Sequence, residues 1–229
     1  MKRKHFFTGV FLIAAFFLWT ILLGIMDVQP IGPQGTMVGF AGLNQAVHMF
    51  TGVNMTLYTV TDWLGLVPLG IMFGFALLGL VPLGFVFGFA LLGLGQWIRR
   101  KHILRVDRSI LTLGVFYLVV MAVYVFFECY VVNYRPVLIE GKLEASYPSS
   151  TTILVLCVMP TVIMQLGTRI RSRIIRRWVS VAMMLFATFM VIGRLLSGVH
   201  WFSDIVGGIL LSAGLVMLYD SVRGTEFRL

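Results

Sequence analysis

The sequence contains few charged residues and very few carboxylates. Only 12% of its 229 residues are charged, about half the share in an ordinary soluble domain, and nine of them are acidic. Apolar residues make up 59% of the chain, and the mean hydropathy is +0.96. A soluble domain of this length has too little interior to bury so much apolar surface. The composition therefore excludes a disordered chain and a coiled coil, and it indicates an integral membrane protein.

Cysteine and histidine are scarce as well. Both cysteines, Cys129 and Cys157, lie inside apolar runs, which is typical of reduced packing residues and excludes a secreted disulfide scaffold. The four histidines are scattered along the chain, so the sequence predicts no metal site.

Six apolar segments are suited to cross a bilayer, for which a helix needs about 20 residues. They are 6–26, 63–98, 110–127, 151–166, 179–192 and 205–219. We therefore expect an all-α fold, a polytopic membrane bundle of six transmembrane helices whose first span is not cleaved. The chain is then one integral membrane domain in three parts: a first span with an external stretch (1–62), an overlong second span (63–98) and a four-helix core (110–220).

Lysine and arginine are concentrated in four regions that alternate along the chain. Fifteen of the 18 fall in the N-terminus, in 99–108, in 169–177 and in the C-terminal tail, and the others are Arg135, Lys142 and Arg194. Loops retained in the cytoplasm carry such an excess of basic residues. The asymmetry predicts that both termini are cytoplasmic. Basic clusters between apolar runs also argue against a nucleic-acid partner, although the net charge is +9.

The second span contains an internal repeat of 14 residues. LVPLGIMFGFALLG at 66–79 is followed by LVPLGFVFGFALLG at 80–93. Since 14 residues are nearly four helical turns, the repeat preserves the helix face, and we expect one long tilted or kinked helix. Its two G-x-x-x-G spacings, Gly70/Gly74 and Gly84/Gly88, serve either as a homodimer contact or as plain apolar filler.

Polar residues outside the basic clusters gather in two stretches, 128–152 and 194–204, which the predicted topology places on the external face. Charge at membrane depth is costly and usually marks function. His200 and Asp204 are four residues apart and share a helix face. A carboxylate that binds one imidazole nitrogen leaves the other free as a base, nucleophile or ligand. Arg194 offers a forked cation suited to phosphate oxygens, although all three residues would also fit an ordinary charged helix end.

The first polar stretch contains NYRP at 133–136 and YPSSTT at 147–152. Proline followed by hydroxyl residues before an apolar run predicts a helix start. Hydroxyls and free N–H groups at a helix N-terminus form an anion site. Taken alone this is an ordinary helix cap, but with two arginines and a His–Asp pair it predicts a phosphate site with a nucleophile.

These residues resemble the motifs of the type-2 phosphatidic acid phosphatase superfamily, integral membrane lipid phosphatases related to vanadium haloperoxidases. The family carries K-x6-R-P, P-S-G-H and S-R-x5-H-x3-D. The third motif is present as Gly193-Arg194-x5-His200-x3-Asp204, with Gly in place of the leading Ser. The resemblance covers about residues 128–208 and extends to the six-span topology with the motifs on the external face.

The resemblance implies a phosphatase that needs neither metal nor cofactor. His200 would attack phosphorus to form a phosphohistidine, and Asp204 would orient and polarise His200. The phosphate oxygens would be bound by the remaining motif residues, Arg135, Arg194, Ser149 and Ser150.

Two motif positions depart from the family. Glu128 stands where the family has a phosphate-binding lysine, and Thr151 stands where it has the histidine that protonates the leaving group. A threonine hydroxyl does not titrate near neutral pH, and a general acid typically contributes 10²–10⁴-fold in rate. A phosphate that leaves from a diphosphate needs protonation much less than an alkoxide does, so the departures favour a lipid diphosphate. Alternatively, Glu128 in its protonated form supplies the proton.

The sequence thus predicts a membrane lipid phosphatase or diphosphatase. It would act on a lipid phosphate or a polyprenyl diphosphate at the external face of a cell membrane, and a bacterial cytoplasmic membrane suits its size and topology. Two alternatives keep the fold: a catalytically impaired homologue that binds lipid phosphates, and a phosphotransferase that passes phosphate to an acceptor other than water. A transporter is disfavoured because the polar residues gather at one face and not at mid-membrane.

Overall fold

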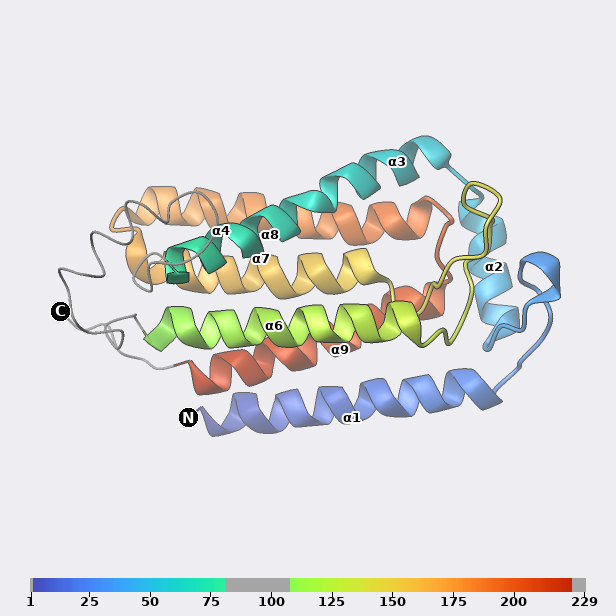
Figure 1. Ribbon diagram of the computed structural model, residues 1–229, viewed down its shortest axis with the longest axis horizontal. Helices are drawn as coiled ribbons and strands as arrows, with labels where there is room; N and C mark the ends of the chain where they lie inside the picture. Colours follow the sequence, from blue (N-terminus) through green and yellow to red (C-terminus); the bar gives the residue numbers. More distant parts are fainter. Residues whose placement is uncertain (1, 81–107, 224–229) are drawn as a thin grey trace.

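The computed structural model describes residues 2–80 and 108–223, and helices dominate this part of the chain (Figure 1). The helices are α1 (Arg3–Ile25), α2 (Ala41–Thr51), α3 (Met55–Leu64), α4 (Leu66–Leu80), α6 (Arg108–Cys129), α7 (Ser150–Arg169), α8 (Arg173–Leu196) and α9 (Phe202–Val222), with a 3₁₀ turn at Pro33–Gly35. The described residues form isolated β-bridges but no β-strand. The expected all-α fold is confirmed.

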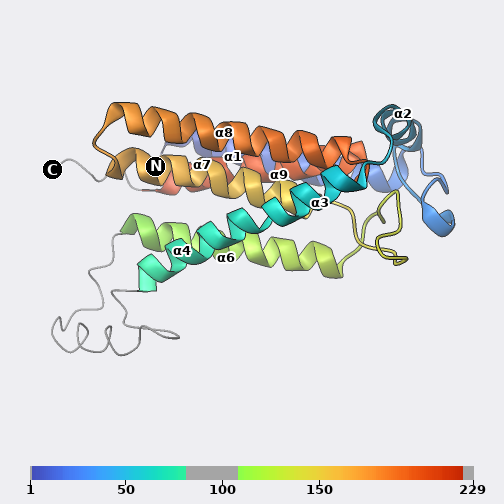
Figure 2. The ribbon, with the colours of Figure 1, turned by 90° about the horizontal axis from the view of Figure 1, so that it is seen from above.

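Six helical stretches in the described ranges are long and apolar enough to cross a membrane. They are α1, the α3–α4 pair, α6, α7, α8 and α9, and both views show them running along one direction (Figures 1 and 2). Their outward faces are apolar: on α1, Phe7, Phe11 and Phe17 are each more than half exposed. Lipid, and not water, is the solvent in which such a surface is stable. The chain is therefore an integral membrane protein.

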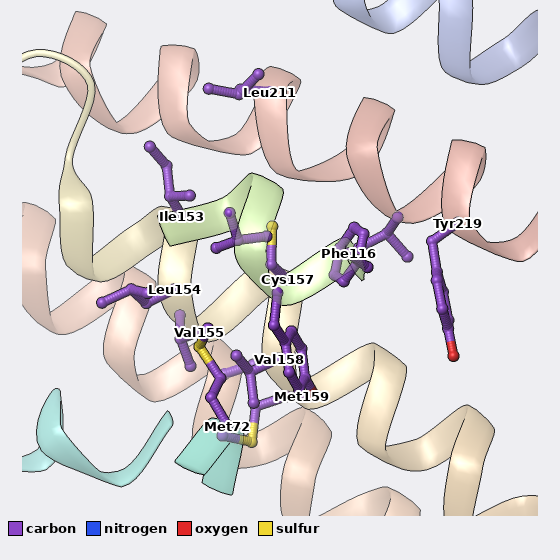
Figure 3. Close-up of a cluster of buried hydrophobic side chains, with 14 of the residues drawn as sticks. Met72, Phe116, Ile153, Leu154, Val155, Cys157, Val158, Met159, Leu211 and Tyr219 are labelled. Carbon is purple, nitrogen blue, oxygen red and sulfur yellow. The ribbon is translucent and has the colours of Figure 1, made fainter. Parts of the chain in front are cut away.

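Helix α7 forms the centre of the core. It packs against α8 and α9 and also contacts α4 and α6, while α1 packs along α9. Figure 3 shows the buried side chains at this centre: Met72, Phe116, Ile153, Leu154, Val155, Cys157, Val158, Met159, Leu211 and Tyr219. The thiol of Cys157 is free and buried, as predicted, whereas Cys129 is free but exposed at the end of α6.

The second span begins earlier than the sequence predicted. Helix α3 starts at Met55 and not near residue 63, because the Asn54 side chain accepts a hydrogen bond from the Leu57 N–H and caps the helix. The hydroxyls of Thr59 and Thr61 donate to carbonyl oxygens one turn back, at 2.9 Å, so these polar residues fit an apolar setting. The helical stretch that is apolar enough to cross a membrane therefore begins at Met55 and not at Trp63.

The repeat is described only in its first copy, which forms most of α4; the second copy, with Gly84 and Gly88, lies outside the described residues. Helices α3 and α4 meet at Gly65. A Cβ added at Gly70 or Gly74 would meet nothing within 4 Å. This G-x-x-x-G spacing therefore makes no close helix contact within the described part of the protein.

The two ends of the described chain meet at one end of the bundle. Asp220, near the end of α9, accepts a hydrogen bond from Lys2 at 2.9 Å and further ones from His5 and Arg223. The turn between α7 and α8, which carries arginines, lies at the same end (Figure 1). An even number of crossings requires this arrangement, and the cytoplasmic placement of this end stays a prediction from the charge count.

At the other end of the bundle, α1 is tied to two neighbouring segments. Trp19 donates from Nε1 to the carbonyl oxygen of Ser203 at 3.2 Å. The Thr20 hydroxyl lies 2.7 Å from the hydroxyl of Tyr147, in the loop before α7. Helix α1 is therefore fixed against α9 along its whole length.

The connection between α2 and α3 lies directly on the turn between α8 and α9. The Asn54 N–H donates to the Ser197 carbonyl oxygen at 3.0 Å. Next to it, Gly198 has a φ of +66°, and a Cβ there would lie 1.8 Å from the carbonyl oxygen of Gly52. Glycine at position 198 thus satisfies two needs at once, the left-handed backbone and the close approach of a second chain segment.

We expect Gly198→Ala to destabilise the protein more than Gly35→Ala. Gly35 also has a positive φ, of +75°, but a Cβ there would meet nothing within 4 Å. Backbone strain alone costs about 1–2 kcal/mol, and the clash at Gly198 should raise the loss to about 3 kcal/mol or more. Thermal unfolding of both variants in detergent measures the difference, and equal losses would mean that the contact with Gly52 is unimportant.

Candidate active site

The two polar stretches meet around one cavity, at the end of the bundle opposite to Lys2 (Figure 1). The cavity has a volume of about 760 Å³ and is lined by α3, α4, α6, α7, α8 and the loop between α6 and α7. Five of the eight motif positions line it: Glu128, Arg135, Ser150, Thr151 and Arg194. The other three, Ser149, His200 and Asp204, are buried behind this wall.

His200 is held by a group on each ring nitrogen. Its Nδ1 lies 3.2 Å from the carbonyl oxygen of Ser146, and its Nε2 lies 3.3 Å from Nη2 of Arg194. A carbonyl oxygen only accepts and a guanidinium only donates. The neutral tautomer that satisfies both contacts carries its proton on Nδ1. Its Nε2 lone pair is then on the side of Arg194, which lines the cavity.

Asp204 reaches His200 through a serine that the sequence analysis missed. The predicted direct hydrogen bond is absent, since Asp204 Oδ2 lies 3.9 Å from His200 Nδ1. The hydroxyl of Ser146 bridges the two groups, 2.5 Å from Oδ2 and 3.1 Å from Nδ1. The i,i+4 spacing does not give direct contact because Asp204 lies in the first turn of α9 and also accepts from the Trp201 N–H, at 2.9 Å.

The start of α9 is further fixed by Asn44 of α2, another residue that sequence reasoning missed. Its side-chain oxygen accepts from the Ser203 N–H, and its amide nitrogen donates to the Ser203 hydroxyl, both at 3.0 Å. Asn44 is fully buried. The one hint in the sequence was a polar amide among apolar residues, in a stretch without Lys or Arg.

Both arginines lie over the ring of Tyr58 of α3. The guanidinium carbons of Arg194 and Arg135 lie 5.0 Å and 5.7 Å from the ring centroid. Arg194 pairs with Asp62 at 3.4 Å, and Arg135 pairs with Glu144 at 3.2 Å. Aromatic faces stabilise cations in this way. The sequence predicted that Tyr58 and Asp62 belong to an external stretch, whereas both lie in α3.

Each arginine keeps one buried nitrogen without a hydrogen-bond partner in the described part of the chain. These atoms are Nε of Arg194 and Nη1 of Arg135. Buried donors are normally satisfied, and one left unpaired is costly. Both residues line the cavity, so an anion bound there would lie beside these guanidiniums.

The start of α7 contributes less to the cavity than the sequence predicted. Ser149 is fully buried, its hydroxyl accepts from Thr152 at 3.1 Å, and its N–H donates to the Asp204 carbonyl oxygen at 3.1 Å. Ser150 and Thr151 line the cavity instead. The hydroxyl of Ser149 is therefore engaged by Thr152 and does not line the cavity, whereas Ser150 and Thr151 of the first turn of α7 do.

Burial and charge keep the imidazole of His200 neutral. Burial lowers the pKa of His200 well below its usual value, and the positive charges of Arg135 and Arg194 lower it further. Hydrogen bonding to Ser146 opposes these effects only in part. A neutral imidazole with an unprotonated Nε2 can act as a nucleophile or a base once the contact with Arg194 is released.

Among residues 2–80 and 108–223, no three His, Cys, Asp or Glu side chains lie close enough together to hold a metal ion.

Comparison with known proteins agrees with the motif analysis. The model of the PAP2 superfamily matches residues 128–227. A search of solved structures finds the crystal structure of the first transmembrane PAP2 type phosphatidylglycerolphosphate phosphatase from Bacillus subtilis, which is 19% identical. The similarity covers 97% of this chain and 100% of that one, with a TM-score of 0.58, and shows a shared fold. No curated protein matches the sequence.

The matched segment contains His200, Asp204, both arginines and the start of α7. Residues 128–227 of this membrane protein therefore match the model of the PAP2 superfamily, the family that the third motif resembled.

Proposed function

We propose that the protein is a membrane lipid phosphatase that hydrolyses a lipid phosphate or diphosphate through a phosphohistidine on His200. The observation that carries the proposal is the environment of its Nε2. That nitrogen keeps its lone pair beside Arg194, and the cavity next to it contains two arginines with unused N–H groups.

In the first step, Nε2 of His200 attacks phosphorus, a P–N bond forms, and the P–O bond to the leaving group breaks. In the free protein an N–H of Arg194 points to Nε2. When substrate binds, a phosphate oxygen accepts the hydrogen bond from this N–H instead, and the Nε2 lone pair becomes free for attack. The imidazole becomes cationic in this step. Its Nδ1–H is held by Ser146, whose hydroxyl donates to Asp204, so the developing charge is stabilised by a buried carboxylate.

In the second step, water attacks the phosphohistidine. The P–N bond breaks, its electron pair returns to Nε2, inorganic phosphate leaves, and a proton of the water passes to solvent. The guanidiniums of Arg135 and Arg194 stabilise the charge on the equatorial oxygens in both steps.

The external face of the membrane is the proposed location of the site. The arginine-rich turn between α7 and α8 lies at the opposite end of the bundle from the cavity (Figure 1). Because basic loops are retained in the cytoplasm, this separation supports an active site that opens outward, and a bacterial cytoplasmic membrane suits a chain of this topology.

A protein that binds lipid phosphates without turnover is the second candidate, and Thr151 favours it. Thr151 lines the cavity at the position where the family has the residue that protonates the leaving group. Glu128, which also lines the cavity, is an alternative proton donor. A phosphotransferase would use the same phosphohistidine and differ only in the acceptor.

His200→Ala should abolish phosphate release from a panel of lipid phosphates and diphosphates, by at least about a thousandfold, because the nucleophile is gone. His5→Ala is the matched control, since His5 lies at the far end of the bundle beside Asp220. Acid-labile phosphate trapped on wild type, and not on His200→Ala, identifies the intermediate. Release that is absent from wild type as well would favour the binding protein, and discharge to an added alcohol would favour the phosphotransferase.

Farnesyl diphosphate should be hydrolysed with a higher kcat/KM than farnesyl phosphate, because phosphate is a better leaving group than an alkoxide. Thr151→His restores an acid at the cavity wall and should raise hydrolysis of the monophosphate more than that of the diphosphate, within the 10²–10⁴-fold range of general acids. A wild-type preference for the monophosphate would reject the leaving-group argument.

The lowered pKa of His200 links the unfolding free energy to pH. Near pH 6.5 the unfolded chain protonates His200 while the buried imidazole stays neutral, so the unfolded state binds more protons as the pH falls. The contribution of His200 to the unfolding free energy therefore decreases below pH 6.5, by on the order of 1 kcal/mol per pH unit. Thermal unfolding in detergent at about pH 7.5 and about pH 5.5 should show a smaller loss for His200→Gln than for wild type. Parallel losses would contradict a neutral, buried His200.

A further inference from the structure

The wall of the cavity carries more acidic than basic groups. Three carboxylates line it, on Asp62, Glu128 and Glu144, against the two guanidiniums of Arg135 and Arg194. The formal charge of the lining is thus negative before any phosphate binds. A phosphate monoester adds up to two negative charges, so a cationic group on the same ligand would offset part of this negative excess.

Two of the carboxylates already have cationic partners, and the third does not. Asp62 pairs with Arg194 and Glu144 pairs with Arg135. Glu128 is exposed to the cavity and is hydrogen-bonded by the Ser150 side chain, and within the described ranges it has no ion-pair partner. Glu128 also stands at the motif position where the family has a lysine, so a negative charge replaces a positive one there.

The surroundings of Glu128 suit a small organic cation. Tyr124 lies four residues before it on α6, so the two side chains share a helix face, and both line the cavity. An aromatic ring beside a carboxylate is a favourable setting for an ammonium group. Glu128 and Tyr124 thus offer a carboxylate and an aromatic ring to a cation bound in the cavity.

The same cavity also has groups that can bind the negative charge of a phosphate. Nε of Arg194 and Nη1 of Arg135 are buried and unpaired, and both guanidiniums belong to the cavity wall. Unused N–H donors on one part of the wall and an unpaired carboxylate on another are complementary to a zwitterion, with a phosphate at the arginines and an ammonium at Glu128.

We propose that the substrate carries a protonated amine close to its phosphate and that Glu128 binds this amine. The substrate class is then an amino-alcohol phosphate ester with a lipid chain. This inference rests on the proposed phosphatase function. Such an amine would also reduce the need for the general acid that is absent at Thr151. A neighbouring ammonium withdraws electrons and makes the departing alkoxide less basic.

The test compares three substrates of equal chain length in mixed micelles: a 2-aminoalkyl phosphate, its N-acetyl derivative and the alkyl phosphate without the amine. Wild type should favour the free amine by about tenfold in kcat/KM. Glu128→Gln should lose that preference, and Glu128→Lys should favour the substrate without the amine. Glu140→Gln is the matched control, because Glu140 is exposed in the loop between α6 and α7 and does not line the cavity.

Binding of the corresponding aminoalkyl and alkyl phosphonates, measured by calorimetry, separates this inference from the proposed function. Tighter binding of the aminoalkyl phosphonate that depends on Glu128, without hydrolysis of any phosphate, would reject the phosphatase and support the amine site. Equal treatment of the amine and its N-acetyl derivative by wild type, or a preference that survives in Glu128→Gln, would overturn the amine site.

Discussion

The carboxylate of Asp204 is the interaction on which both the fold and the candidate site depend. One of its oxygens accepts from the Trp201 N–H, which starts α9, and from Ser146, which holds His200. The backbone carbonyl of Asp204 accepts from the Ser149 N–H at the start of α7. A buried carboxylate is costly unless it is hydrogen-bonded, so these partners are needed as much for stability as for chemistry. The two central helices and His200 are thereby fixed by one residue.

The buried arginine of this site has to be stable both with and without a ligand. The side chain of Arg194 is 1% exposed, in a bundle whose surroundings are apolar. Without a ligand, Asp62, the ring of Tyr58 and Nε2 of His200 provide its partners. A buried charge needs such compensation. In the proposed mechanism a phosphate oxygen replaces the contact with Nε2, so His200 stays covered until an anion enters.

Much of the architecture could be predicted from the sequence, because the length and hydropathy of a spanning helix are set by the bilayer. The helical class, the six apolar stretches and the grouping of His200 with Arg194 near Arg135 all agree with the structure. The same reasoning misplaced the start of the second span, because hydropathy counts threonine as polar. Within α3 the hydroxyls of Thr59 and Thr61 bond to their own helix.

The residues that sequence reasoning missed share one property. Ser146, Asn44 and Tyr58 act through contacts with segments that are more than fifty residues away in the chain. Motif spacing reports on neighbours along one helix, whereas these contacts depend on how the helix ends and loops pack. The position of Asp204 illustrates the limit: the spacing to His200 was correct, but the bridging hydroxyl comes from another loop.

Because α1 is fixed along α9, a truncated protein without α1 would lack contacts that the rest of the chain uses. The part that matches the PAP2 superfamily starts at residue 128, yet Trp19 binds the carbonyl of Ser203 and Thr20 binds Tyr147. Asn44 binds the N–H at the start of α9. The amino-terminal third thus works as a scaffold for a centre whose recognisable signature lies wholly beyond it. A fragment that starts at residue 128 would keep every motif residue but lose the contacts from α1 and α2 that hold these residues in place.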